Sequence, residues 1–329
     1  MSSNVAVFGA YGYTGRFVVA ELRERGHVPV VVGRDREKLL ALGEEHVRQA
    51  SVDDPASLDR ALAGVDAVVN TAGPFAATAG PVVEAALRAG IPYVDVAAEI
   101  EANVDTFKHF VGRAGVVVPA MAFFGGLGDL LVTAALDDWT SADEVHVAYG
   151  LSSWHPTAGT VQSGVVSGRR RGGRRVRFTG GRLEYHDDAL PTVEWTFPAP
   201  LETQDVIAEF TMADVVTVPS HLDVPEVRTY MSANAAADLA GAATPTAVDE
   251  RGRSAQTFVV DVLVRSGGAE RRISATGQDI YAISAPLAVE AVERILTGRI
   301  KATGVVSAGA AFDAPDFLRA LSPHLTVHS

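Results

Sequence analysis

The sequence lacks cysteine altogether, has three lysines among 28 basic residues and contains no long apolar run. Without cysteine the chain cannot form disulfides, use a thiol nucleophile or bind an iron–sulfur cluster. No run approaches the about 18 apolar residues of a membrane helix. The apolar run at 5–8 is too short for a signal peptide and follows no basic region. We expect a cytoplasmic protein without a membrane partner.

The scarcity of lysine excludes one common reductase mechanism. Short-chain dehydrogenases need a Tyr-x-x-x-Lys pair, in which the ammonium group lowers the pKa of the phenol. The positions four residues before the lysines hold Arg34, Val104 and Thr297. The sequence also lacks a P-loop, a nucleophile elbow and paired histidines at metal-binding spacing. We therefore expect a different class of enzyme and no metal site.

The charge balance is acidic, with 40 acidic and 28 basic residues and a formal charge of −12 over 329 residues. A net negative chain is poorly suited to nucleic-acid binding, so we expect no such partner. The length fits one large domain or two of ordinary size.

Residues 1–120 alternate between short apolar runs and patterns of helical periodicity. This alternation is typical of βαβ units with a parallel sheet. The expected strands are 5–8, 28–32, 46–49, 67–69, 93–96 and 116–118, and the expected helices are 16–25, 35–42, one entered at 54–55, 81–88 and 102–113.

The pattern changes to neighbouring strands after residue 143, which predicts a largely antiparallel sheet. The expected strands are 145–151, 175–178, 193–197, 227–231, 258–264 and 271–275, and the expected helices are 127–136, 284–296 and 316–321. We expect an α/β fold in three parts: a Rossmann domain over 1–125, an α+β substrate and dimerisation domain over 126–282, and helices over 283–329 that pack back on the Rossmann domain.

A glycine-rich turn carries the strongest functional signal. It follows the first expected strand and opens the first expected helix, and it reads Gly9-Ala10-Tyr11-Gly12-Tyr13-Thr14-Gly15. Glycines at such a turn allow the backbone to approach a pyrophosphate, and the free N–H groups of the helix then bind it. The alternative is a turn that only lets the strand and the helix pack closely.

The end of the second expected strand distinguishes NADP from NAD. NAD-binding proteins place a carboxylate there for the ribose 2′-hydroxyl, but this sequence has Gly33 followed by Arg34. A guanidinium binds a 2′-phosphate in bidentate fashion. We therefore favour NADP(H), with Asp35 as the N-cap of the next helix.

Further segments complete a family resemblance. They are residues 69–75 (VNTAGPF) and 89–99 (AGIPYVDVAAE), with weaker matches at 158–163 (AGTVQS) and 277–281 (GQDIY). Together with the glycine turn they resemble the saccharopine dehydrogenase-like family, including its trans-acting enoyl reductase relatives. The strong part of the resemblance covers residues 1–130. Ala98 and residues 123–129 depart from the family pattern, which suggests a different substrate.

The resemblance implies roles for particular residues. The turn residues Gly9, Tyr11, Gly12, Tyr13, Thr14 and Gly15 would surround the pyrophosphate, Arg34 would bind the 2′-phosphate, and Asn70, Thr71, Ala72, Gly73, Pro74 and Phe75 would border the nicotinamide ribose. Glu99 would lie near the cleft.

The proton donor, if one is needed, is not defined by any motif. The candidate catalytic residues are Glu99, Tyr281 and His155, and the carboxylates Asp95 and Asp129 are further candidates. For each of them a structural role as a helix cap, ion pair or packing residue is the alternative.

The predicted function is NADPH-dependent hydride transfer to an imine, enoyl or carbonyl group of a small molecule, by a homodimer. The alternative is a non-catalytic NADP sensor or interaction protein. A cluster of arginines between 169 and 177 would either dock a carrier- or coenzyme A-linked substrate or form a solvated turn, and we favour the turn.

Overall fold

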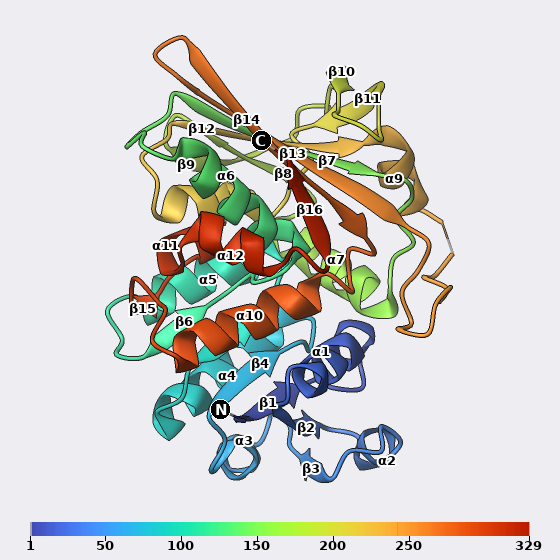
Figure 1. Cartoon of the computed structure of the whole chain (residues 1–329), viewed down its shortest axis with the longest axis vertical. Helices are drawn as coiled ribbons and strands as arrows, with labels where there is room; N and C mark the ends of the chain where they lie inside the picture. Colours follow the sequence, from blue (N-terminus) through green and yellow to red (C-terminus); the bar gives the residue numbers. More distant parts are fainter. Residues whose placement is uncertain (1, 242, 329) are drawn as a thin grey trace.

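The computed structural model describes residues 2–241 and 243–328, which form two sheets with helices around and between them (Figure 1). Within these residues the first sheet has seven parallel strands, and the second has nine strands that are mostly antiparallel. The predicted fold class is therefore confirmed.

The first sheet has the strand order β15-β6-β5-β4-β1-β2-β3. Its strands are β1 (Asn4–Phe8), β2 (Val28–Gly33), β3 (His46–Gln49), β4 (Ala67–Asn70), β5 (Tyr93–Asp95), β6 (Val116–Val118) and β15 (Gly304–Val305). The chain passes from β1 to β2 and β3 and then returns to β4 on the other side of β1. The ends of β1 and β4 therefore meet at the topological switch point, where α/β sheets bind their ligands.

Both faces of the first sheet are buried, because alternate strand residues contact helices on opposite sides. Val5 and Val7 face α1 (Tyr13–Glu24) and α10 (Ser284–Leu296), whereas Ala6 and Phe8 face the other side. That side is covered by α3 (Pro55–Leu62), α4 (Phe75–Ala89) and α5 (Ile100–Phe110), while the short α2 (Arg36–Leu40) follows β2.

The second sheet contains a long hairpin, β13–β14, between the middle strand β7 and the edge strand β16. Its main path is β10-β11-β12-β7-β13-β14-β16, and β8 and β9 branch from β12. The strands are β7 (Glu144–Leu151), β8 (Arg175–Thr179), β9 (Arg182–His186), β10 (Thr192–Thr196), β11 (Thr203–Ala208), β12 (Glu226–Ser232), β13 (Thr257–Ser266), β14 (Ala269–Gln278) and β16 (Leu325–His328).

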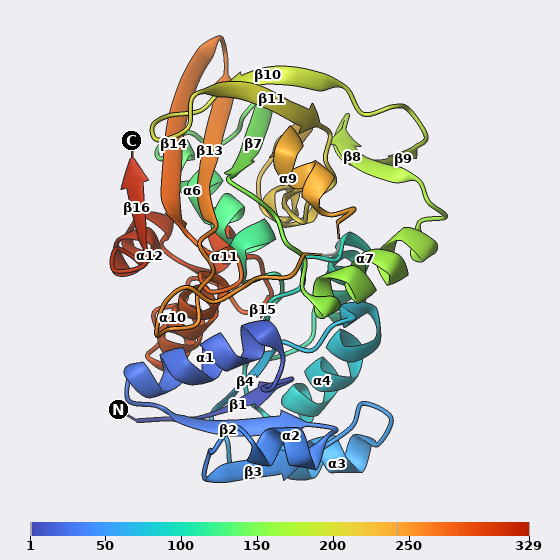
Figure 2. The same ribbon diagram turned by 90° about the vertical axis from the view of Figure 1, so that its right-hand side faces the viewer.

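The remaining helices connect and cover the sheets. They are η1 (Phe123–Leu127), α6 (Gly128–Leu136), α7 (Ala158–Arg170), α8 (Asp214–Thr217), η2 (Val218–Ser220), α9 (Ala233–Asp238), α11 (Ala308–Ala311) and α12 (Ala314–Ala320). Figure 2 shows α7 beside α4, so a helix that follows β7 of the second sheet lies against the first sheet's helices. In the described parts of the chain, no helix combines the length and the apolar character needed to cross a bilayer.

The structure differs from the sequence prediction in several elements. Helix α4 begins at Phe75, six residues before the predicted start at Pro81, because the Glu99 carboxylate caps its first turn across the chain. Strands β9, β11, β15 and β16 were not predicted. They have two to six residues each, which is too few for a periodic pattern to stand out in the sequence.

One hydrophobic core connects the two sheets. It runs from Val7 and Val69 of the first sheet through Leu130 of α6 and Leu287 of α10 to Val262 of the second sheet. The two sheets therefore cannot separate without opening this core.

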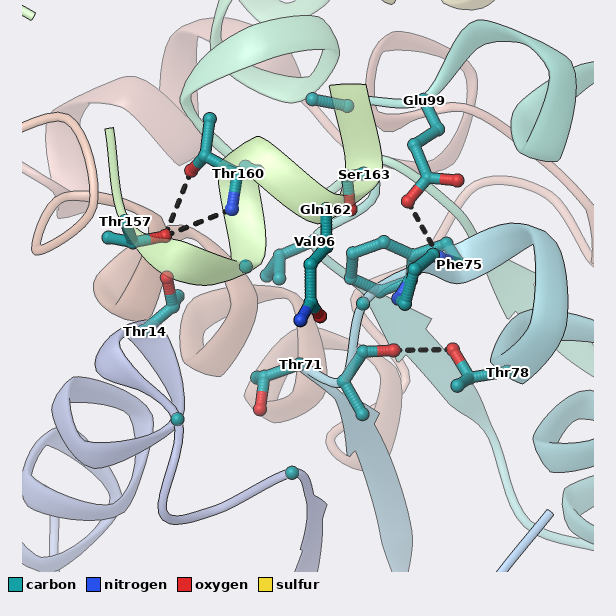
Figure 3. Close-up of a pocket in the computed structure, with 18 of the residues that line it drawn as sticks. Thr14, Thr71, Phe75, Thr78, Val96, Glu99, Thr157, Thr160, Gln162 and Ser163 are labelled. Atoms are coloured by element: carbon teal, nitrogen blue, oxygen red, sulfur yellow. Dashed lines mark hydrogen bonds between the residues drawn. The ribbon is translucent and has the colours of Figure 1, made fainter. Parts of the chain in front are cut away.

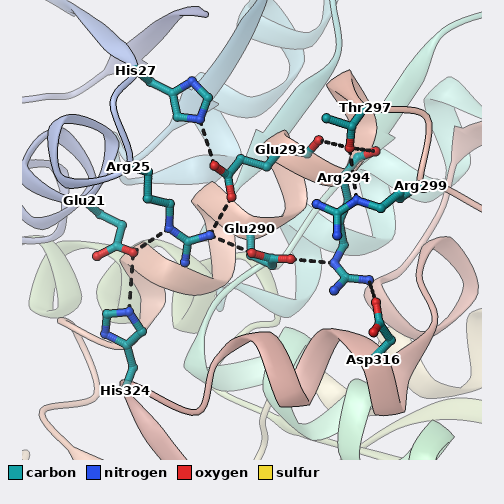
Figure 4. Close-up of polar contacts among 10 residues, drawn as sticks. All are labelled: Glu21, Arg25, His27, Glu290, Glu293, Arg294, Thr297, Arg299, Asp316 and His324. Atoms are coloured by element: carbon teal, nitrogen blue, oxygen red, sulfur yellow. Dashed lines mark hydrogen bonds and ion pairs between the residues drawn. The ribbon is translucent and has the colours of Figure 1, made fainter. Parts of the chain in front are cut away.

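A network of ion pairs attaches α10 to α1 (Figure 4). Arg25, which follows α1, has a side chain only 18% exposed and contacts Glu21 at 2.8 Å and Glu290 and Glu293 at 2.6 Å. Buried carboxylates need such a partner, because desolvation otherwise penalises their charged form. Burial raises the pKa of Glu21 and of Glu293, but hydrogen bonds lower both values by more. Glu21 is hydrogen-bonded to His324 and Arg25, and Glu293 is hydrogen-bonded to His27 and Arg25, so both pKa values lie below the ordinary value.

We predict that Arg25→Met strongly destabilises the protein. The substitution leaves three neighbouring carboxylates without their shared cation, and breaking a buried pair in this way costs about 3–5 kcal/mol. The free energy of unfolding, measured by urea denaturation at pH 7, should fall by this amount.

The matched control is Arg60→Met, because Arg60 pairs with Asp54 at 3.6 Å with side chains 70% and 55% exposed. An exposed pair contributes about 0–1 kcal/mol.

The lowered pKa values of Glu21 and Glu293 set the pH dependence. Their contribution is present above the ordinary pKa of 4.5 and is lost as the pH falls through the lower pKa of the folded state. The difference in the free energy of unfolding between wild type and Arg25→Met should therefore shrink below about pH 4.5. Equal losses of stability in Arg25→Met and Arg60→Met at pH 7 would contradict the stabilising role of the buried ion pairs.

Candidate active site

A cavity of about 790 Å³ lies at the carboxyl ends of the first sheet's strands and extends under α7. Its floor is formed by the segments that follow β1, β2 and β4, and its far wall is formed by η1, α7 and the segment after β14. Figure 3 shows the part of this cavity between α7 and the end of β4. The cavity includes the topological switch point, so its position fits a dinucleotide site.

The glycine turn connects β1 to α1 and lines the cavity with Gly9, Tyr11, Gly12, Tyr13 and Thr14. Gly9 has a φ of +90°, and a Cβ on it would lie 2.8 Å from Ala72. Gly9 is therefore required by packing within the protein. At this position the structure agrees with the alternative in which the turn lets the strand and the helix pack closely.

Gly12 is different, because a Cβ there would meet only the Gly9 carbonyl oxygen, at 3.1 Å. Gly12 is the N-cap of α1, and no side chain caps this helix. The free N–H groups of the first turn are therefore available to an anion in the cavity. The turn fits a dinucleotide pyrophosphate on the face of Gly12, while Gly15 is buried and does not line the cavity.

Arg34 lines the cavity at the end of β2, and its side chain is exposed. Among the described residues no carboxylate pairs with its guanidinium group. Gly33 before it cannot carry a side chain without a shift, because a Cβ would lie 2.8 Å from the Tyr11 ring. The carboxylate typical of NAD sites therefore has no room here, and the free guanidinium fits a 2′-phosphate.

The segment after β4 divides into buried and lining residues. Thr71, Ala72, Gly73, Pro74 and Phe75 line the cavity. Asn70 does not line it: its amide nitrogen donates to Thr78 at 3.3 Å and to Tyr93 at 3.1 Å, and its oxygen accepts from the Ala72 N–H at 3.0 Å. Asn70 therefore holds the segment after β4 in place from its buried side through these hydrogen bonds.

Glu99 lines the cavity but is 5% exposed, and both carboxylate oxygens are bonded. They accept the N–H groups of Phe75 at 2.7 Å and Ala76 at 3.1 Å, so Glu99 caps α4. This cap fixes the 71–75 segment against the cavity, and a catalytic role for Glu99 stays a prediction.

Asp95 lies behind the cavity wall rather than in it. Burial raises the pKa of Asp95 to about 6, although its carboxylate accepts N–H groups from Ala97 and Ala120 and the hydroxyl of Tyr93. Asp129 is fully buried and accepts from the Gly309 N–H at 2.7 Å, with His221 at 2.7 Å from its other oxygen. Both carboxylates have structural partners.

Tyr281 lies at the junction of the second sheet and α10 and lines the cavity. Its hydroxyl group contacts Trp154 Nε1 at 3.2 Å, the Thr157 N–H at 3.3 Å and Thr160 Oγ1 at 3.0 Å. Burial raises the pKa of Tyr281 above its ordinary value. The third candidate, His155, does not line this cavity. It lines a second cavity of about 360 Å³, and Trp154 and Tyr281 line both cavities.

The arginine cluster is mostly engaged in contacts within the protein. Arg170 pairs with Asp105 at 2.6 Å, and Arg171 pairs with Glu101 at 3.5 Å, which attaches α7 to α5. Arg177 contacts three carboxylates, those of Glu184, Asp188 and Glu209. Arg171 is the member of this cluster that lines the main cavity.

Several lining residues were not identified from the sequence. They are Ser51, Val52 and Asp53 after β3, Trp154 and Met212 of the far wall, and Thr157, Gln162, Ser163 and Ser167 of α7 and its N-cap. The segment 158–163 belongs to the sequence resemblance, but the resemblance predicts no role for it. The other residues lie in segments without any recognisable motif, and only the tertiary fold brings them to the cavity.

The fold and the turn define a dinucleotide-binding Rossmann unit, and residues 5–118 match the family model described as the saccharopine dehydrogenase NADP binding domain. This part of the chain is therefore similar to the NADP-binding domain of saccharopine dehydrogenases, as the sequence resemblance implied. The NADP(H) prediction is confirmed with it.

Curated relatives are similar to part of the chain, and a solved structure shares its fold. Saccharopine dehydrogenase-like oxidoreductases from Bos taurus and Homo sapiens are 32% and 31% identical, over 29% of this chain and 28% of each relative. The chain thus spans less than a third of these relatives' length. The apo saccharopine dehydrogenase (L-Glu forming) from Saccharomyces cerevisiae aligns over 99% of both chains with a TM-score of 0.65 and 13% identity, which shows a shared fold.

We predict that Arg34→Ala weakens NADPH binding selectively. The lost hydrogen bonds to a charged group are worth about 1.5–3 kcal/mol, or roughly 10- to 100-fold in Kd. NADH lacks the 2′-phosphate, so its Kd should remain within about twofold. Fluorescence titration of both cofactors measures this difference, and equal losses for NADPH and NADH would show that Arg34 is not the phosphate ligand.

Proposed function

We propose that the protein is an NADPH-dependent reductase that transfers hydride to an imine, enoyl or carbonyl group of a small molecule. The observation that carries the proposal is that the cavity is continuous. The glycine turn lines one part of it, and apolar side chains enclose a chamber in another part. A protein that only bound the dinucleotide would need no such chamber. In this proposal residues 1–125 bind the cofactor and form one side of the chamber, 126–282 supply its far wall, and 283–329 complete the cover of the first sheet.

The bound cofactor would supply the hydride, and the chain would supply position and exclusion of water. The turn at 9–15, Arg34 and residues 71–75 would hold the dinucleotide. The chamber beyond them is lined by Phe75, Val96, Phe124, Trp154 and Met212. These apolar side chains exclude water from the reacting groups, which strengthens the electrostatic interactions within the site.

Polar groups also line the cavity beside these apolar side chains. They include the hydroxyl groups of Thr160, Ser163, Thr211 and Tyr281, the amide of Gln162 and the guanidinium group of Arg171. An apolar lining with a limited set of polar groups suits a substrate that is largely apolar and carries a reducible polar bond. A homodimer, a cytoplasmic location and a carrier-linked substrate stay predictions.

The test is hydride transfer from deuterated NADPH to panels of cyclic imines, enoyl thioesters and ketones. Stopped-flow absorbance follows NADPH oxidation, and mass spectrometry detects deuterium in the product. We expect turnover within one of the three classes. Tight NADPH binding with no turnover in any class would favour the non-catalytic sensor.

A chamber-filling variant separates the substrate space from the cofactor site. Ala98 is exposed to the cavity, so Ala98→Phe should place a ring in the chamber without touching the glycine turn. We predict that kcat/KM falls at least about tenfold because the substrate is displaced. The Kd for NADPH should stay within about threefold of wild type. Unchanged turnover would mean that the substrate binds elsewhere.

A further inference from the structure

The motif at 158–163 forms the start of α7, which lies across the cavity from the glycine turn. A Cβ on Gly73 would lie 2.8 Å from Ser163 Oγ, so α7 closely approaches the segment after β4. The rings of Tyr13 and Tyr281 meet edge to face with centroids 5.4 Å apart. Figure 3 draws Thr14 of α1 and Thr157 of α7 on facing sides of the same opening.

Three hydroxyl groups form a chain at this point. Tyr281 Oη is 3.0 Å from Thr160 Oγ1, which is 2.9 Å from Thr157 Oγ1. The Tyr281 oxygen already accepts two N–H groups, from Trp154 and from the Thr157 backbone. Since a hydroxyl oxygen has two lone pairs, the Tyr281 hydrogen must be donated to Thr160.

The two oxygen–oxygen contacts use two of the three hydroxyl hydrogens. Thr157 Oγ1 also accepts the Thr160 N–H at 3.1 Å as the cap of α7, which uses no further hydroxyl hydrogen. Whichever threonine donates to the other, one hydrogen of the pair has no acceptor among the described residues. Both threonines line the cavity, so this hydrogen is available to a ligand.

We propose that the Thr157–Thr160 pair donates this hydrogen bond to the diphosphate of the bound dinucleotide, so that α7 closes the cofactor site from above. The inference rests on the placement of the cofactor on the glycine turn under the proposed function. The diphosphate lies at the start of α1 in such turns, and this is the position that Thr157 faces. Tyr281 is then a positioning residue, because it fixes the direction of the hydroxyl chain.

The carboxylates around the cavity have other partners or lie elsewhere. The acidic lining residues are Asp53, which follows the edge strand β3, and Glu99, whose two oxygens are occupied by the α4 cap. The buried Asp279 lies near Tyr281 and accepts the N–H groups of Ser254, Tyr281 and Ala282. Hydrogen bonds to an ionised acceptor are also stronger than those between neutral groups.

The sharpest variant is Thr157→Asp, with Thr157→Ser as its conservative partner. Aspartate is as good an N-cap as threonine, so α7 keeps its cap. The carboxylate accepts the Thr160 hydrogen, leaves no hydrogen for the ligand and repels a phosphate. Thr157→Ser retains the donor and should bind NADPH like the wild type.

Three ligands locate the effect: NADPH, 2′-phospho-ADP-ribose and adenosine 2′-monophosphate, which lacks the diphosphate. Calorimetry on the full chain should show that Thr157→Asp weakens the first two by about 10- to 100-fold. Binding of adenosine 2′-monophosphate should be unchanged, which also shows that the variant is folded. Thr196→Asp controls for net charge, since Thr196 pairs with Thr203 at 2.8 Å on an exposed hairpin.

Two results would overturn the inference: unchanged affinity of Thr157→Asp for all three ligands, or an equal loss for all three. A loss as large in Thr196→Asp would also overturn it. Failure of the proposed function is a separate outcome, in which the wild type binds NADPH and passes no hydride to any acceptor. The affinity differences would still decide the role of Thr157 in that case.

Discussion

The position of the cavity depends on the hydrophobic core that the two sheets share. Leu130 of α6 and Leu287 of α10 belong to the same buried cluster as Val7 of the first sheet and Val262 of the second. Because this cluster is close-packed, the second sheet holds α7 at a fixed place above the strand ends of the first. The glycine turn alone provides half of a binding site, and the shared core determines what lies opposite that turn.

The charges show how a strongly acidic protein can present a selective cationic group. Most arginines near the cavity have carboxylate partners: Arg170 pairs with Asp105, and Arg171 with Glu101. Arg34 differs from them, since its side chain is exposed at the cavity and no carboxylate of the described residues pairs with it. In the proposed site, selectivity for the phosphorylated cofactor depends on this one exposed guanidinium group and not on an excess of positive charge around it.

The sequence predicted the first sheet and the turn well, because these depend on local patterns. Short apolar runs and glycines are sufficient to place β1, α1 and β2. The sequence could not show that Glu99 caps a helix that begins 24 residues earlier, or that Asn70 is directed inward. It also could not place Thr157 opposite Thr14. These contacts are made between segments distant in sequence, and spacing along the chain carries no information about them.

The edge strand β15 gives the fold a particular order of assembly. Gly304 and Val305 pair with Val116 and Val117 of β6, and α10 covers the same sheet from the same late part of the chain. The whole second sheet except β16 lies between these partners in sequence. Contacts of such long range are slow to form. During synthesis the face of the first sheet that α1 and α10 cover together would stay incompletely covered until residues 284–305 had emerged, so cofactor could stabilise the protein only as a late step of folding.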